Sequence, residues 1–175
     1  MSQKPFSSYI TPRSRLTNFQ KVLEFNKAFG VKCNTTIQHD IFDKDPKLVD
    51  YRLSLIEEEV DEFKLAIKQK NMTEILDSIS DSLYVILGAA TAFGFDADKA
   101  FDLVHKSNMS KLCETEDDAI ITVKKYKGEV PQRYDSPAYR KSDDGNYFVV
   151  YNQSTMKILK NYKYSPVSFT SLLEK

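Results

Sequence analysis

The stretch that decides the fold is Leu55-Ile-Glu-Glu-Glu-Val-Asp-Glu-Phe63, which places five acidic residues among four apolar ones. Successive residues of an α-helix turn by about 100°, so a helical wheel shows which acids face the core. Glu59 lies in the middle of the apolar face, with Glu62 beside it and Glu58 at its margin. The apolar residues within roughly 60° of Glu59 on that wheel are Leu48, Leu55, Ile56, Phe63 and Ala66.

The opposite side of this helix carries charges typical of a solvated face. They are Asp50, Glu57, Asp61, Lys64 and Lys68. A carboxylate that points into a core is costly unless its charge is compensated. The inward acids therefore need a partner, whereas Glu57 and Asp61 do not.

A second acidic helix follows. Between Ile75 and Phe93 the only charged residues are Asp77 and Asp81, one turn apart, and both faces of this helix are expected to be covered. Its continuous apolar face is formed by Ile75, Ile79, Leu83, Ile86, Ala90 and Phe93. Inward acids on two helices can converge on one point, where a hard divalent cation such as Mg²⁺ would neutralise them. The alternative is a set of partly exposed acids at the bundle edges, each paired with Lys or Arg.

Caps and periodicity predict four helices, over about 17–29, 46–69, 71–93 and 97–109. Asp45 followed by Pro46 is a strong start signal for the second helix. Asn71 and Glu74 have the spacing of a capping box, and Gly94 ends the third helix. Because the connections are short, we expect an all-α antiparallel bundle.

The pattern becomes loop-rich after about residue 125. We therefore predict an all-α domain over 17–125 and a C-terminal extension over 126–175 that packs on the same domain. Residues 147–151 form a β-type run, and residues 156–159 could pair with it as a short hairpin.

Composition excludes several classes of protein. The 175 residues include 25 Lys and Arg against 25 Asp and Glu, so no global charge favours a nucleic acid polymer or a membrane surface. Cys33 and Cys113 are expected to be reduced thiols. Met1–Leu16 contains no apolar core of a secretory signal, and no stretch reaches the ~18 apolar residues of a membrane span. A soluble, cytoplasmic protein is expected.

These motifs resemble a known family. Residues 52–63 are similar to the E-E-x-x-E helix of MazG-like and phosphoribosyl-ATP-pyrophosphohydrolase-like proteins, and residues 77–85 resemble their second acidic helix. Residues 104–111, which include Asn-Met-Ser-Lys, and residues 157–166, which include Tyr-Ser-Pro, resemble one branch of that family. The resemblance implies an all-α fold whose active site is built by helices from two subunits, in a homodimer or tetramer.

The resemblance also implies a metal site. The family's E-x-x-E pattern corresponds to Glu59 and Glu62, and Asp81 matches the last acid of its E-x-x-D pattern. Ser78 stands where the family has the other Glu, and Asp77 is expected to act from the neighbouring position. These four acids would hold Mg²⁺, with Mn²⁺ as an alternative.

The activity implied is hydrolysis of a nucleoside triphosphate to a monophosphate and pyrophosphate. A water, deprotonated by the metal or by Glu58, would attack the α-phosphorus in line. Lys106, Lys111 and Lys160 are candidates to neutralise the leaving pyrophosphate, although a solvated surface position explains each equally well. Asn108 could orient a phosphate or a base edge. Two alternatives stay open: hydrolysis of phosphoribosyl-ATP, and a non-catalytic, metal-stabilised helical interaction protein.

Overall fold

The computed structural model describes residues 16–174, so the prediction that Met1–Leu16 holds no secretory signal lies almost wholly outside the described residues. The chain divides into two compact units, Met1–Asp98 and Lys99–Lys175. The first contains α1 (Asn18–Ala28), α2 (Ile41–Lys44), α3 (Pro46–Gln69) and α4 (Met72–Phe93). The boundary falls near the start of α5 (Ala97–Met109). The second unit continues with α6 (Glu116–Lys127), β1 (Pro137–Lys141), β2 (Phe148–Asn152), β3 (Lys157–Ile158) and α7 (Thr170–Leu173).

The four predicted helices are confirmed as α1, α3, α4 and α5, and their caps explain where three of them begin. The Thr17 side chain and Gln20 form a capping box on α1. The Asp45 carboxylate accepts a hydrogen bond from the backbone N–H of Leu48 at 3.3 Å, with Pro46 at the first helical position of α3. Asn71 caps α4 by accepting from the Thr73 and Glu74 amides.

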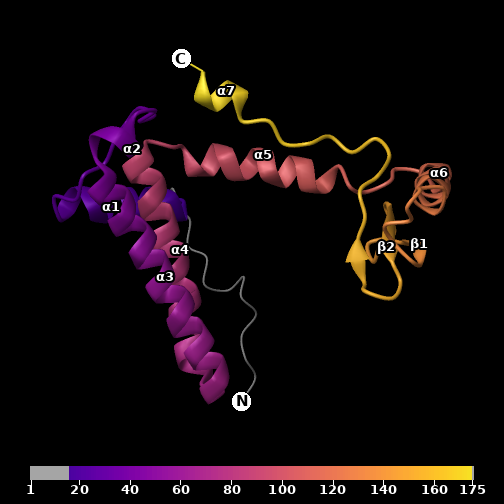
Figure 1. The fold of residues 1–175 in the computed structure, drawn as a ribbon, viewed down its shortest axis with the longest axis horizontal. Helices are drawn as coiled ribbons and strands as arrows, with labels where there is room; N and C mark the ends of the chain where they lie inside the picture. The colour runs from indigo at the N-terminus through magenta and orange to yellow at the C-terminus, as the bar shows by residue number, and fades with distance from the viewer. Residues whose placement is uncertain (1–15, 175) are drawn as a thin grey trace. The chain divides into compact units, whose positions relative to one another are not determined.

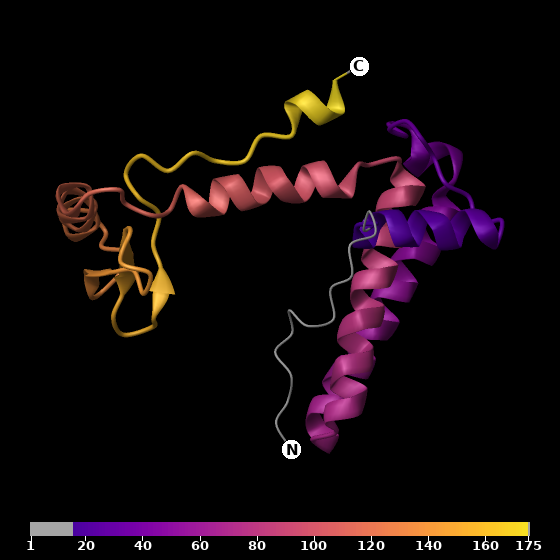
Figure 2. The same ribbon diagram turned by 180° about the vertical axis from the view of Figure 1, so that it is seen from behind.

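Helices α3 and α4 form an antiparallel hairpin, and they lie side by side in both views of the ribbon (Figures 1 and 2). Small residues on α4 permit the close approach, since Ser78, Gly88 and Ala92 are all buried. Helix α1 also packs on α4, and the buried Asn26 amide donates to the Thr91 hydroxyl at 3.0 Å. The first unit is therefore a helical hairpin braced by α1.

The continuous apolar face predicted for residues 75–93 is not covered within one chain. Ile79 is 44% exposed, Leu83 53% and Ile86 48%. The expectation that both faces are covered is therefore wrong for the single chain, because the buried side of α4 is its small-residue side.

Gly94 explains how the C-terminal end of α4 is held. It adopts a left-handed conformation with φ +76°, and a Cβ at this position would lie 2.0 Å from the Thr36 carbonyl oxygen. The loop before α2 crosses here, where the Asn34 and Gln38 amides donate to the carbonyl oxygens of Thr91 and Phe93. Only glycine fits between this loop and the helix end.

The second unit contains a small antiparallel sheet in the order β1-β2-β3. The predicted hairpin is confirmed, with Tyr151 opposite Ile158 in the β2–β3 register. Sequence analysis missed β1 and α6, both of which pack with β2. A core of Cys113, Ala119, Val123, Val150 and Leu159 joins them. The predicted domain limits at 125 and 126 stay a prediction, although α6 packs with the strands that follow it.

Helix α4 is long and apolar enough, by length and composition alone, to cross a membrane. The core helices of soluble proteins can have the same length and composition, so this property is weak evidence for a membrane span. Asp77 and Asp81 lie within this helix, on the side discussed below.

Candidate active site

The acids of α3 differ in exposure, and Glu59, in the middle of the predicted apolar face, is the one acid of residues 57–62 that is not exposed. Glu59 is half-buried, whereas Glu57 and Asp61 are exposed. Asp61 forms a surface ion pair with Lys64 at 2.9 Å, one turn along the helix. Glu58 and Glu62 flank Glu59 and are both exposed. Glu59 is thus the most buried acid of this run.

Glu59 lies within electrostatic reach of the other four acids assigned to the site. Its pKa is raised above the ordinary range, first by desolvation and then by the negative charges of Glu62, Asp81, Glu58 and Asp77, in that order. Its Oε2 atom is buried and has no hydrogen-bond partner. A buried carboxylate oxygen without a donor is available to coordinate a cation, which would compensate its charge.

Asp77 and Asp81 are exposed on α4, whereas Ser78 between them is buried. The Ser78 hydroxyl donates to the Glu74 carbonyl oxygen of its own helix at 2.8 Å. The Ser78 hydroxyl is therefore hydrogen-bonded within its own helix and does not replace the family's glutamate. Asp81 acts on Glu59 more strongly than Asp77 does, as expected for the acid that matches the family motif.

The present side-chain positions do not form a closed ligand set. Within residues 16–174, no group of three or more His, Cys, Asp or Glu side chains is arranged to hold a metal ion. The four-acid site at Glu59, Glu62, Asp77 and Asp81 therefore stays a prediction, which their mutual electrostatic influence favours.

Arg52 does not neutralise the acids. It lies two turns before Glu59 on α3 and is 7% exposed, and its Nε and Nη2 atoms are buried without a hydrogen-bond partner. A Cβ added at Gly88 would lie 3.2 Å from its Nη1 atom, which places the guanidinium against α4. No ion pair between Arg52 and an acid is present in the described part of the chain.

The four predicted substrate residues all belong to the second unit. Lys106 and Asn108 are exposed on α5, and the Lys111 ammonium donates to the Asn108 amide oxygen at 2.7 Å. The Lys160 ammonium lies 4.5 Å from the centre of the Tyr164 ring. Their contacts with substrate stay predictions.

The two branch-specific motifs are hydrogen-bonded to each other. The Ser107 hydroxyl donates to the Ser165 carbonyl oxygen at 2.9 Å and the Tyr164 hydroxyl at 3.0 Å. The Asn161 side chain donates to the Leu112 carbonyl oxygen at 2.7 Å. The Tyr-Ser-Pro tail therefore fixes the segment that carries Asn108 and Lys111, which gives these motifs a structural reason to occur together.

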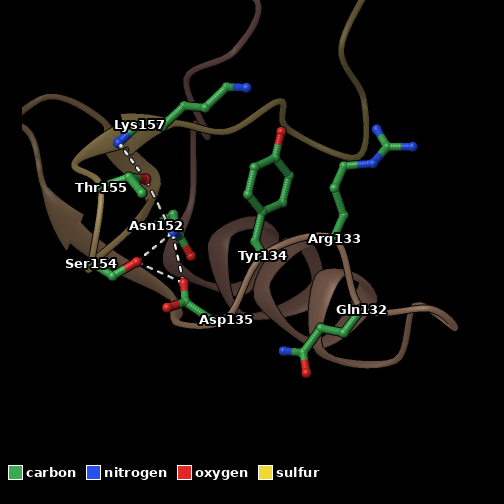
Figure 3. Close-up of a pocket in the computed structure, with 8 residues that line it drawn as sticks. All are labelled: Gln132, Arg133, Tyr134, Asp135, Asn152, Ser154, Thr155 and Lys157. Carbon is green, nitrogen blue, oxygen red and sulfur yellow. Dashed lines mark hydrogen bonds between the residues drawn. The ribbon is translucent and has the colours of Figure 1, made fainter.

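Sequence analysis missed a group of polar residues around a cavity in the second unit (Figure 3). A signal was present in the run Arg133-Tyr-Asp135, where opposite charges flank an aromatic residue. The other half of the cavity follows β2, and only the fold brings the two segments together.

Comparisons with known proteins match the part of the chain that carries these acids. A family model described as phosphoribosyl-ATP pyrophosphohydrolase matches residues 22–108, which include α3, α4 and the start of the Asn-Met-Ser-Lys motif. An uncharacterised protein of Acanthamoeba polyphaga mimivirus is 30% identical over an alignment that covers 94% of this chain and 99% of that protein. Such a match supports hydrolysis of a pyrophosphate bond in a nucleotide as the type of activity. The chain belongs to the phosphoribosyl-ATP pyrophosphohydrolase family, within the MazG-like pyrophosphohydrolase superfamily.

Proposed function

We propose that this protein is a magnesium-dependent pyrophosphohydrolase that cuts a nucleoside triphosphate at the α-phosphorus, releasing a monophosphate and pyrophosphate. The observation that carries the proposal is the half-buried Glu59, which is surrounded by the charges of four other acids and has an oxygen without a donor. A soluble, cytoplasmic location is part of the same proposal.

The donor set suits a hard divalent cation. Glu59, Glu62, Asp77 and Asp81 offer only carboxylate oxygens, which Mg²⁺ and Mn²⁺ prefer over softer donors. No His or Cys lies among them, which argues against a zinc or di-iron centre. When bound, Mg²⁺ supplies positive charge against the phosphate oxygens and polarises water.

The protein's own residues divide the remaining work. Glu58 is exposed beside Glu59 and is not needed to complete the four-acid set, so it can accept a proton from the attacking water. Lys106, Lys111 and Lys160 are the candidates for neutralising the pyrophosphate that leaves. Asn108 would orient a phosphate or a base edge once substrate displaces the Lys111 ammonium from its amide.

Self-association belongs to this proposal. The α3–α4 hairpin leaves apolar side chains exposed along both helices: Leu53, Val60, Leu65, Leu76, Ile79, Leu83 and Ile86. Exposed apolar surface of this extent marks an interface. A second copy of the same hairpin is the occupant we propose, because a symmetric dimer pairs like surfaces and would cover the apolar side chains of both copies at once.

Phosphoribosyl-ATP is the second candidate substrate, and the description of the matching family model favours it. The same metal site would serve both reactions, since each breaks the bond between the α- and β-phosphates. A non-catalytic, metal-stabilised interaction protein is the third outcome that a test must separate.

A substrate panel separates these functions. Pyrophosphate release would be measured for the common ribo- and deoxyribonucleoside triphosphates and for phosphoribosyl-ATP, with Mg²⁺ and with a chelator. We expect Mg²⁺-dependent turnover of at least one nucleoside triphosphate that exceeds turnover of phosphoribosyl-ATP. The reverse preference would assign phosphoribosyl-ATP as the substrate, and no release from any compound would contradict the proposed activity.

A further inference from the structure

A cavity of about 520 Å³ lies in the second unit, and none of its lining residues is among those assigned to the active site above. One wall is the segment before β1, and the other is the turn that joins β2 to β3. Its lining residues are Gln132, Arg133, Tyr134, Asp135, Asn152, Ser154, Thr155 and Lys157 (Figure 3). Its size lies within the range of roughly 300–1,000 Å³ that small-molecule sites occupy.

The floor of the cavity is a hydrogen-bonded network centred on Asp135. Its Oδ1 atom accepts bonds from the Ser154 hydroxyl at 2.7 Å, the Asn152 amide at 2.9 Å and the Ser136 hydroxyl at 3.1 Å. Asn152 is 2% exposed and also donates to the Thr155 hydroxyl at 3.1 Å. The network ties the two walls together, so the cavity is built into the fold.

These donors keep the Asp135 carboxylate ionised. They lower its pKa to about 2, with the Ser154 hydroxyl contributing most and the Asn152 amide next. All three side-chain bonds go to Oδ1, and within residues 16–174 no side chain donates to Oδ2. The Oδ2 atom of this charged carboxylate is thus able to accept a hydrogen bond from a ligand.

Two cations border the same cavity. Figure 3 shows Arg133 and Lys157 on either side of Tyr134, and the Lys157 ammonium lies 5.4 Å from the centre of that ring. Neither side chain forms an ion pair in the described part of the chain. Between residues 124 and 163 there are nine Lys and Arg against four Asp and Glu, so this stretch of the chain carries a net positive charge.

We propose that this cavity is a second nucleotide-binding site, in which Arg133 and Lys157 bind the phosphates and Asp135 accepts a hydrogen bond from a sugar hydroxyl. Both cations are exposed and are therefore open to an anion, and the arginine guanidinium can bind a phosphate through two parallel hydrogen bonds. A bare phosphate or pyrophosphate would meet the Asp135 charge and leave much of the space empty. A nucleotide satisfies both ends, since it offers phosphates to the cations and hydroxyl donors to the carboxylate.

Binding of ADP and of pyrophosphate to the full-length protein tests the proposal. Calorimetry would be carried out with a chelator present, so that the carboxylates of α3 and α4 cannot bind phosphates through a metal. We expect ADP to bind, and R133Q and K157Q each to weaken it about tenfold, the value of one lost charge-assisted contact. K124Q, an exposed charge on α6, is the matched control and should leave the affinity unchanged.

Asp135→Asn separates a nucleotide site from a simple anion site. The asparagine oxygen can still accept the network bonds, so the floor is retained, but the charge that attracts the sugar hydroxyl is removed. ADP should bind more weakly to this variant, and pyrophosphate should bind equally well or better. Amide NMR shifts on ADP addition should centre on residues 132–136 and 152–157, which identifies the site even if a variant folds poorly.

Three results would overturn the proposal. These are no ADP binding, ADP binding that R133Q and K157Q leave intact, and ADP and pyrophosphate affinities that respond alike to Asp135→Asn. Mg²⁺-dependent pyrophosphate release is measured in a separate assay. The proposed activity and the proposed second nucleotide site can therefore each be refuted without deciding the other.

Discussion

Replacing Glu59 by glutamine should stabilise the metal-free protein, although it removes a residue of the proposed metal site. Glu59 Oε2 is buried and accepts no hydrogen bond. An unsatisfied buried acceptor costs about 1–3 kcal/mol. Glutamine removes the charge and supplies an N–H that can donate to a neighbouring carboxylate. The gain should therefore be about 1–3 kcal/mol, and each kcal/mol raises the Tm of a chain of this size by about 2–4 °C.

The dependence on pH follows from the raised pKa of Glu59. A carboxyl whose folded pKa lies above its ordinary value of 4.5 contributes stability when protonated, and this contribution is lost as the pH rises through the folded pKa. The advantage of E59Q should thus be largest near pH 7.5 and should shrink as the pH falls toward 4.5. Thermal melts in chelator across this range measure it.

Magnesium should reverse the ranking. An ion that binds only the folded parent stabilises it by about 2.7 kcal/mol at a hundredfold excess over Kd, and E59Q should lose most of that gain. Glu57→Gln is the matched control, because Glu57 is exposed on the same helix and should change both quantities by less than about 0.5 kcal/mol. If E59Q destabilised the metal-free protein, or gained as much from Mg²⁺ as the parent does, the convergence of acids would be refuted.

Four further outcomes are expected. E62Q should lower kcat at least about a hundredfold, because losing a metal ligand should cost more than the roughly 10–100-fold loss seen when a residue that only orients a ligand is removed. D61N should retain activity, and equal losses in the two variants would mean that the predicted rotation of the helix is wrong. Light scattering should give at least twice the chain mass of 20.1 kDa, and a monomer at micromolar concentration would contradict the proposed interface. Leu159→Ala should cost about 2–5 kcal/mol in urea unfolding, because Leu159 is 1% exposed in the core of the second unit, and a loss below about 1 kcal/mol would contradict that packing. Lys163 and other donors lower the pKa of Asp118, so its contribution to stability is present above the unfolded pKa and is lost as the pH falls through the folded one; D118N should lose that acid sensitivity, which melts at pH 7 and pH 3 would show.

Local signals in the sequence determined the helices of the first unit. Asp45, Pro46, Asn71 and Gly94 lie where a cap or a chain reversal needs their particular backbone or side chain, and each marks a helix end in the structure. Such signals act over three or four residues, so they can be read without knowledge of the fold. Similar signals surround α6, where Thr115 accepts a hydrogen bond from the Asp118 amide, and they could have revealed that helix.

Strand β1 could not be found in the same way. It begins with Pro137, lies at the edge of the sheet and contacts only β2 among the described strands. A strand of this kind exists because a partner offers its hydrogen bonds, and here that partner follows a turn of several residues.

The helical wheel separated Glu59 from Glu57 and Asp61, because the side on which a helical residue lies depends only on its position in the chain. Tertiary structure decided the rest. Packing against α3 buried the side of α4 that carries small residues and left its larger apolar residues exposed. Folding also brought Arg133 and Lys157 to one cavity, although 23 positions separate them in the sequence. Periodicity shows which faces of an element are alike, but only the neighbouring element determines which face is buried and which distant side chains meet.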